Sequence, residues 1–338
     1  MKNLRKNKKF VLGASVALTA LMLAAATFAW FSAQDSVDNN FSTGGIPDGS
    51  VKVWEIFDKE DPWNPGEEVN KDVAVANFGE EPLFVRATFK EYQSRMEAEG
   101  VNLKVTSLDA KVTDFTTGAY KPVPVIDYAT AAGWKEASAA GYTFTTPLPA
   151  GVTMYVREDT AVAGGPAKVS YAVTTNYGAD LGNGRVSGTF VLDDTAKTIT
   201  ASAIKYDYYT KDTAASGTKV WSETAFPTNP NVSALDSLIT FKFHEADLTS
   251  TANDTWYYNA EDGWFYLIGV VEGGTVSPML LDSVTLDGAA NNTYQYMDYT
   301  LTVNVEGLQA TEKALADWNL AAGNKVYDAL KVHAIPEK

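Results

Sequence analysis

Apolar and polar residues alternate along one run after another of this sequence, and this period of two constrains the fold more than any other feature. Successive side chains of a β-strand point to opposite faces, so each run predicts a strand with one buried face. With turn residues between the runs and no βαβ alternation, the pattern predicts an all-β fold: an antiparallel two-sheet jelly-roll sandwich with short C-terminal helices. The apolar positions of the clearest runs are Val69, Val73, Val75; Leu83, Val85, Ala87, Phe89; Ile239, Phe241, Phe243; and Tyr299, Leu301, Val303, Val305.

The spacing of three pairs of runs predicts β-hairpins. Residues 78–82 separate the run that ends at Asn77 from the run 83–89. Residues 193–197 join the runs 185–192 and 198–208, and residues 259–263 join 256–258 and 264–268. A helical pattern appears only at 310–320, with Thr311 as the candidate N-cap and Gly323 as the stop.

The N-terminus has the pattern of an export leader. Residues 1–29 contain five basic residues and no acid, and an uncharged stretch rich in Ala, Leu and Val runs from 10 to 28. Small residues at Thr27 and Ala29 occupy the positions that a signal peptidase reads, so we predict a signal peptide of residues 1–29, cut between Ala29 and Trp30. A cut after Ala26 is an alternative. A retained membrane anchor is another, because the stretch approaches the ~20 residues of a spanning helix.

Residues 30–45, which follow the predicted cut, alternate like a strand. We call them the N-terminal arm. A strand with an apolar face and an unpaired backbone either docks on its own domain or adds itself to the sheet of another molecule. One face of the arm is largely apolar, with two polar interruptions, Asp35 and Asn39; its apolar residues, the predicted donor-strand residues, are Phe31, Ala33, Val37 and Phe41.

Several short segments, in their order along the chain, resemble the TasA and camelysin family of exported bacterial proteins, and within it the longer BsaA-type biofilm matrix proteins. The match covers roughly the first and the last hundred residues. The segments are T-F-A-W-F-S at 27–32, D-S-V-D-N-N-F-S-T-G at 35–44, N-F-G at 77–79, F-V-R at 84–86, D-G-W-F-Y-L at 262–267, L-L-D-S-V-T-L at 280–286 and E-G-L-Q-A-T-E at 306–312.

The resemblance implies an exported structural subunit whose leader is removed by a signal peptidase of the SipW type. It further implies that the main partner of the processed chain is another copy of itself, in a head-to-tail polymer, with an accessory matrix protein as a further partner. Contact with the membrane is then limited to the uncleaved leader. Camelysin is classified as a peptidase, so the resemblance also raises proteolysis as a function.

The middle of the chain differs in composition from its flanks. Glycine, alanine, threonine and proline dominate residues 101–235, and the alternation weakens there. We predict a β-rich lobe at 101–235, inserted into a core formed by residues 46–100 and 236–338. Tyr206, Tyr208, Tyr209 and Trp221 in this region offer either a sugar-stacking surface or the filling of a small β core, and the second interpretation is favoured.

Charge and cysteine content exclude several partners. The chain has a formal charge of -15, and outside residues 1–29 it carries 22 basic and 42 acidic residues. Such an acidic chain repels nucleic acid and anionic lipid. The sequence contains no cysteine. Disulfide staples and thiol chemistry are therefore absent, which fits a secreted protein of a bacterium that does not rely on oxidative folding.

The residues of common catalytic sites are scarce. There are two histidines, His244 and His333, and no H-E-x-x-H segment. No serine lies in a nucleophile elbow, and Gly182–Gly184 leads into a strand rather than into the helix of a phosphate loop. The acidic loop 58–68 lacks the spacing of a calcium-binding loop. We therefore predict no catalytic residue, no cofactor and no metal site.

These observations favour a structural subunit, not an enzyme, that acts outside the cell. We expect it to form fibres by donor-strand addition of the arm. One alternative is a monomeric surface-binding module whose arm docks on its own sheet and whose lobe recognises a glycan. The other is a camelysin-like secreted peptidase.

Overall fold

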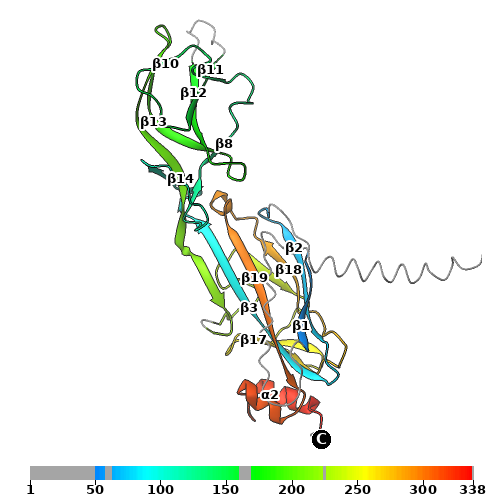
Figure 1. The fold of residues 1–338 in the computed structure, drawn as a ribbon. Helices are drawn as coiled ribbons and strands as arrows, with labels where there is room; N and C mark the ends of the chain where they lie inside the picture. The colour runs from blue at the N-terminus through cyan, green and yellow to red at the C-terminus, as the bar shows by residue number, and fades with distance from the viewer. Residues whose placement is uncertain (1–49, 58–62, 160–168, 224–225, 337–338) are drawn as a thin grey trace, which may run out of the picture. The chain divides into compact units, whose positions relative to one another are not determined.

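A computed structural model of the chain describes residues 50–57, 63–159, 169–223 and 226–336. The predicted signal peptide, its cleavage site at Ala29 and Trp30, and the predicted donor-strand residues Phe31, Ala33, Val37 and Phe41 lie outside the described residues. The chain divides into two compact units (Figure 1). The described parts of 1–94, 214–291 and 297–338 form the first unit, and those of 95–213 and 292–296 form the second. These limits differ from the predicted lobe 101–235, because residues 214–235 belong to the first unit.

The first unit contains two antiparallel sheets. One is four-stranded in the order β1-β2-β18-β15, and in the other β3 lies between β17 and β19, with β16 beyond β17. The aromatic ring of Phe89 on β3 lies 6.0 Å from that of Phe243 on β15, so the two sheets pack face to face. The strands are β1 (Val51–Phe57), β2 (Glu68–Asn77), β3 (Leu83–Met96), β15 (Ile239–Phe243), β16 (Thr255–Asn259), β17 (Trp264–Ile268), β18 (Leu281–Leu286) and β19 (Asp298–Gln309).

Aromatic side chains fill the centre of this sandwich. Trp221 is fully buried, with ring centroids 5.0 Å from Phe89 and 5.8 Å from Phe241. Its indole donates a hydrogen bond of 2.6 Å to the buried carboxylate of Glu91. The indole therefore belongs to the core of the first unit, and not to a sugar-binding surface.

The predicted hairpin between 69–77 and 83–89 is wrong. β2 pairs with β1 and β18, whereas β3 pairs with β19 along its length and with β17, so the turn at 78–82 carries the chain from one sheet to the other. Asn77 stabilises this crossing, because its side-chain amide donates to the carbonyl oxygens of Glu81 and Val271 at 2.8 and 2.9 Å. Alternation predicted both strands, but it does not select their partners.

The other two predicted hairpins are confirmed. β16 pairs with β17, and in the second unit β13 pairs with β14. The core of that unit buries Tyr206 and Tyr208, as the favoured interpretation of these residues predicts. Its elements are β4 (Ala98–Glu99), β5 (Asn102–Leu103), β6 (Val105–Leu108), β7 (Tyr120–Pro122), β8 (Pro124–Val125), β9 (Lys135–Glu136), β10 (Thr143–Phe144), β11 (Val152–Glu158), β12 (Val169–Asn176), β13 (Asn183–Asp193), most of β14 (Thr198–Val220) and the 3-10 helix η1 (Asn292–Tyr294).

Short helices close the C-terminal part of the first unit: the 3-10 helix η2 (Lys313–Trp318), α2 (Lys325–Leu330) and the 3-10 helix η3 (Lys331–His333). They pack on Phe84, Tyr266 and Leu308 of the β3 sheet. The predicted helix at 310–320 is therefore a shorter 3-10 helix, and it ends at Asn319 in a left-handed conformation rather than at Gly323. The predicted N-cap Thr311 is also wrong by one residue, because the N-cap is Glu312, although the hydroxyl of Thr311 accepts a hydrogen bond from the Ala314 amide at 3.3 Å.

The predicted all-β class is confirmed. Apart from the parallel pair of β10 and β14, the strand pairs named above run antiparallel.

Candidate functional site: the open edge of β1

β1 is the edge strand of the four-stranded sheet, and its backbone shows which residues face outward. The Phe78 amide bonds to the Ser50 carbonyl at 2.6 Å, and β1 continues this antiparallel pairing through even-numbered residues. The amides of Asn77 and Val75 bond instead toward the 275–277 segment. The N–H and C=O groups of Val51, Val53 and Glu55 consequently point away from β2, and within the described part of the chain no group hydrogen-bonds to them.

Two other edges of the first unit are covered. On the outer side of β15, the amide of Phe241 donates to the carbonyl of Asn231 at 2.9 Å. On the outer side of β16, the amide of Tyr258 donates to Leu248 at 2.8 Å, and the amide of Trp256 donates to the Glu245 carboxylate at 3.2 Å. The outer sides of β15 and β16 thus carry further hydrogen bonds, whereas β1 has no such partner among the described residues, and β1 is therefore an edge on which another strand can continue the ladder.

An ion pair lies on the inner face of the β1 edge. Glu55 points inward like Val51 and Val53, and its carboxylate pairs with the ammonium of Lys71 on β2. The Lys71 side chain is 1% exposed and the Glu55 side chain 20% exposed. This pair is not among the residues predicted from the sequence. Its signal was a charged residue at one position of the apolar face in each of two neighbouring strands.

The outer face of β1 is more exposed. Ile56 is 46% exposed, and the Lys52 ammonium lies 5.5 Å from the ring centroid of Phe78, which is itself 66% exposed. At the start of the strand, Val51 packs against Gly307 of β19, where a Cβ atom would lie 2.5 Å from Val51 Cγ2. The first residue of β1 is thus fixed against the opposite sheet.

Several motif residues of the predicted family meet in a second cluster. The guanidinium of Arg86 donates to one oxygen of Glu306 at 2.9 and 2.6 Å, and its carbon lies 4.0 Å from the ring centroid of Trp264. Its Nη1 donates to the hydroxyl of Tyr266, which in turn donates to Asp262 at 2.8 Å. Burial raises the pKa of Tyr266. These three motif segments therefore converge under the C-terminal helices, where they stabilise the sheet.

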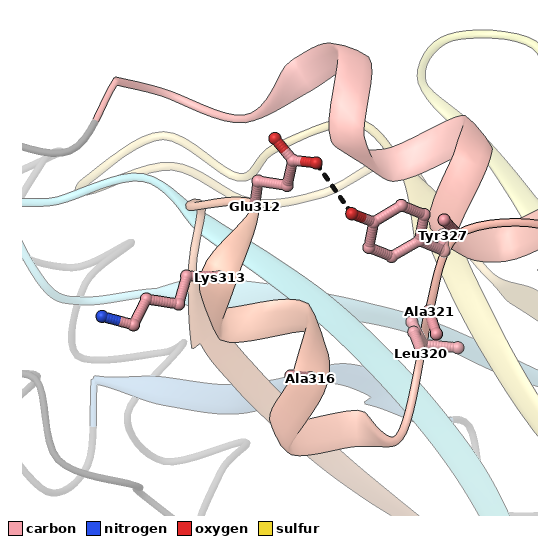
Figure 2. A pocket seen from close by; sticks show the side chains of 7 residues that line it. Glu312, Lys313, Ala316, Leu320, Ala321 and Tyr327 are labelled. Carbon is pink, nitrogen blue, oxygen red and sulfur yellow. Dashed lines mark hydrogen bonds between the residues drawn. The ribbon is translucent and has the colours of Figure 1, made fainter.

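The surface also has two open, shallow hollows. One, of about 450 Å³, lies in the first unit between η2 and α2, where the Tyr327 hydroxyl donates to Glu312 at 2.7 Å and the Lys313 side chain points away from this bond (Figure 2). The other, of about 510 Å³ in the second unit, is lined by threonines and by the Lys104–Glu97 ion pair. Neither of the two is lined by a histidine.

The two histidines that the sequence contains lie in separate segments of the first unit, and neither belongs to a metal-binding cluster of the described residues. His244 is a 55% exposed residue at the end of β15, and its Nδ1 lies 3.0 Å from Asp282. His333 lies in η3. Across the described ranges, no group of three His, Cys, Asp or Glu side chains is arranged to hold a metal ion. In the same ranges no helix has the length and apolar character needed to cross a bilayer.

The chain was compared with family models, curated proteins and solved structures, and none of these matches it.

Proposed function

We propose that this chain is an exported structural subunit that polymerises into extracellular fibres of a biofilm matrix. In this proposal the N-terminal arm of one copy adds as a strand to the β1 edge of the next copy. Head-to-tail contacts of this kind do not need to close into a ring, so they generate filaments. The proposal includes removal of the leader by a signal peptidase of the SipW type, which frees the arm.

The observation that supports the proposal best is the outward backbone of Val51, Val53 and Glu55. Each net backbone hydrogen bond contributes about 0.5–1.5 kcal/mol. The arm also has an apolar face to bury, and each of its two Phe side chains contributes about 1.5–3 kcal/mol when it is transferred from water. Ordering the backbone costs about 1–2 kcal/mol per residue, so these terms favour a short paired strand over a long one.

A proline at position 53 tests the proposal. Proline removes the N–H that points away from β2 and is tolerated at such positions of edge strands. We expect processed Val53→Pro to fold, with unchanged far-UV circular dichroism, and to form no filaments by electron microscopy. Val53→Ala, which loses side-chain surface but keeps the N–H, should still polymerise. Filaments of normal length from Val53→Pro would contradict addition to the β1 edge.

Deletion of residues 30–41 separates the polymer from a monomer with a self-docked arm. In the fibre proposal the deleted protein folds with nearly unchanged stability and remains monomeric. In the alternative the deletion lowers the free energy of unfolding, because the monomer loses a strand of its own sheet. Sedimentation velocity and urea denaturation of the two proteins decide between them.

A further inference from the structure

The Glu55–Lys71 pair places a carboxylate at one position of the β1 edge, and an arm that adds to this edge has to align with that carboxylate. The inference rests on the proposed function. A pair with a buried ammonium stabilises a fold little in comparison with apolar residues of similar size, but in some systems a buried polar group fixes the register of neighbouring elements. Here the pair lies beneath the strand edge that lacks a neighbour in the described residues.

A strand that adds beside β1 covers the remaining exposed part of Glu55. Covering a carboxylate costs free energy unless the new neighbour supplies a hydrogen-bond donor. The apolar face of the arm has two polar interruptions, Asp35 and Asn39. The amide of Asn39 donates hydrogen bonds, whereas the carboxylate of Asp35 only accepts them and carries the same charge as Glu55.

Antiparallel registers that keep the apolar face of the arm inward differ from one another by two residues, and each places a different residue opposite Glu55. Asp35 in that position places two carboxylates side by side, which destabilises a strand pair. Ala33, Val37 or Phe41 in that position gives the carboxylate no donor. Asn39 in that position offers the Glu55 carboxylate an amide donor. Phe41 then lies opposite Val53, and Asp35 lies beyond Phe57, the last residue of β1.

Parallel addition is less favourable. With Asn39 opposite Glu55 in a parallel pair, Asp35 falls opposite Val51, a residue with no exposed surface that packs on Gly307. The arm carboxylate would then lose its hydration without gaining a cation.

We propose that Asn39 of the arm pairs with Glu55 of the receiving β1 edge and so selects one antiparallel register: Phe41 opposite Val53, Asn39 opposite Glu55 and Val37 opposite Phe57. The Glu55–Lys71 pair is thereby the specificity-determining feature of the edge. The occupant is the arm of a second copy of this chain; residue 45, the last residue of the arm, lies six positions before Val51, the first residue of β1.

Cysteine scanning reads the register directly, because the natural chain contains no cysteine. One cysteine replaces Lys52, which is exposed and whose backbone bonds to β2 rather than to the arm. The second replaces Asp38, Asn40, Ser42 or Gly44 in turn. Antiparallel residues of a non-hydrogen-bonded pair lie about 4.5 Å apart at Cα, within the range of a disulfide, and a shift of two residues exceeds it. We expect efficient oxidation only for Ser42→Cys with Lys52→Cys.

The outcomes separate the register from the polymer. Isotope-labelled and unlabelled chains are mixed before oxidation, and mass spectrometry identifies links between chains. A 42–52 link between chains supports both proposals. Preferred links at 38, 40 or 44 together with filaments would overturn the register alone. Links confined to single chains would overturn the polymer, and no link at any position would overturn both.

Moving the charge provides a second test. Asn39→Asp sets a carboxylate opposite Glu55, and we expect it to raise the critical concentration for polymerisation roughly tenfold or more. Adding Glu55→Gln returns one anion and one amide to the pair, with their positions exchanged, and should recover most of the loss. Ser36→Asp, a matched charge on the opposite face of the arm, should change the critical concentration little. An equal effect of both single substitutions would overturn the pairing of Asn39 with Glu55.

Discussion

Gly307 of β19 faces Val51 of β1 at a distance that leaves no room for a side chain, because a Cβ atom at 307 would lie 2.5 Å from Val51 Cγ2. This contact fixes the first residue of the open edge against the opposite sheet. The edge therefore has one anchored end.

Gly307→Ala should force β1 and β19 apart. Overpacking of this kind costs about 1–3 kcal/mol of the free energy of unfolding, measured by urea denaturation. Gly217→Ala serves as the control, because a Cβ atom at 217 meets no heavy atom within 4 Å and its backbone is not left-handed. Equal stability of the two variants would show that β1 and β19 accommodate the added methyl group without a loss of stability.

Arg86→Lys should destabilise the first unit by about 1–3 kcal/mol, because a lysine replaces neither the two hydrogen bonds to Glu306 nor the planar contact with Trp264. Arg157→Lys is the matched control. Arg157 also lies over a tryptophan, Trp134, but its side chain is 44% exposed against 13% for Arg86. Thermal unfolding should shift clearly for Arg86→Lys and little for Arg157→Lys.

Glu91→Gln should lower the free energy of unfolding by about 2–4 kcal/mol, because the amide replaces one accepting oxygen with an N–H donor. The carboxylate of Glu91 accepts bonds of 2.6 Å from both Trp221 and Tyr299, one of 2.9 Å from the Ala234 amide, and another from Ser233. Urea denaturation followed by tryptophan fluorescence measures the change in the free energy of unfolding. Tyr299→Phe removes a single donor and should cost less; the reverse order would contradict this account of the cluster.

Acid should destabilise the four-stranded sheet through Glu68. The Ser283 hydroxyl, followed by Lys242, lowers the pKa of Glu68 below its ordinary value near 4.5. The stabilisation is therefore present above that value and is lost as the pH falls through the lower folded-state pKa. Glu68→Gln should flatten the dependence of the urea midpoint on pH between about 6 and 3.

Glu245 should show the opposite sign. Burial raises its pKa, so the folded state holds this proton more tightly than the unfolded chain does. Its contribution favours folding below the ordinary value near 4.5 and is lost as the pH rises through the folded-state pKa. The urea midpoint of Glu245→Gln should therefore exceed that of the natural protein by more at neutral pH than at pH 4. A lower midpoint at neutral pH would contradict this sign.

Local alternation predicted the strands but only some of their partners. The hairpins at 185–208 and 256–268 are confirmed, because their turns return the chain to the same sheet. The turn at 78–82 is of similar length, yet β3 crosses to the other sheet. There it pairs with β19, more than two hundred residues away in sequence. The energy that decides between these paths is non-local, and no short window of sequence contains it.

The edge itself was even less predictable. The charges at Glu55 and Lys71 are visible in the sequence as breaks in two apolar faces, but only the pairing of β1 with β2 brings them together. The direction of the backbone groups of Val51 and Val53 follows from which residues of β2 bond to β18, and this too is a property of the assembled sheet. The arm and its apolar face were predicted from sequence and remain a prediction.

In the proposed polymer each subunit donates one arm and accepts one arm at its β1 edge, and this gives the fibre a polarity. A subunit without its arm can still accept a neighbour's arm, but it offers nothing to the molecule that should follow. Small amounts of such truncated subunits would act as chain terminators at one end only. They would shorten the fibres while leaving the opposite end free to grow.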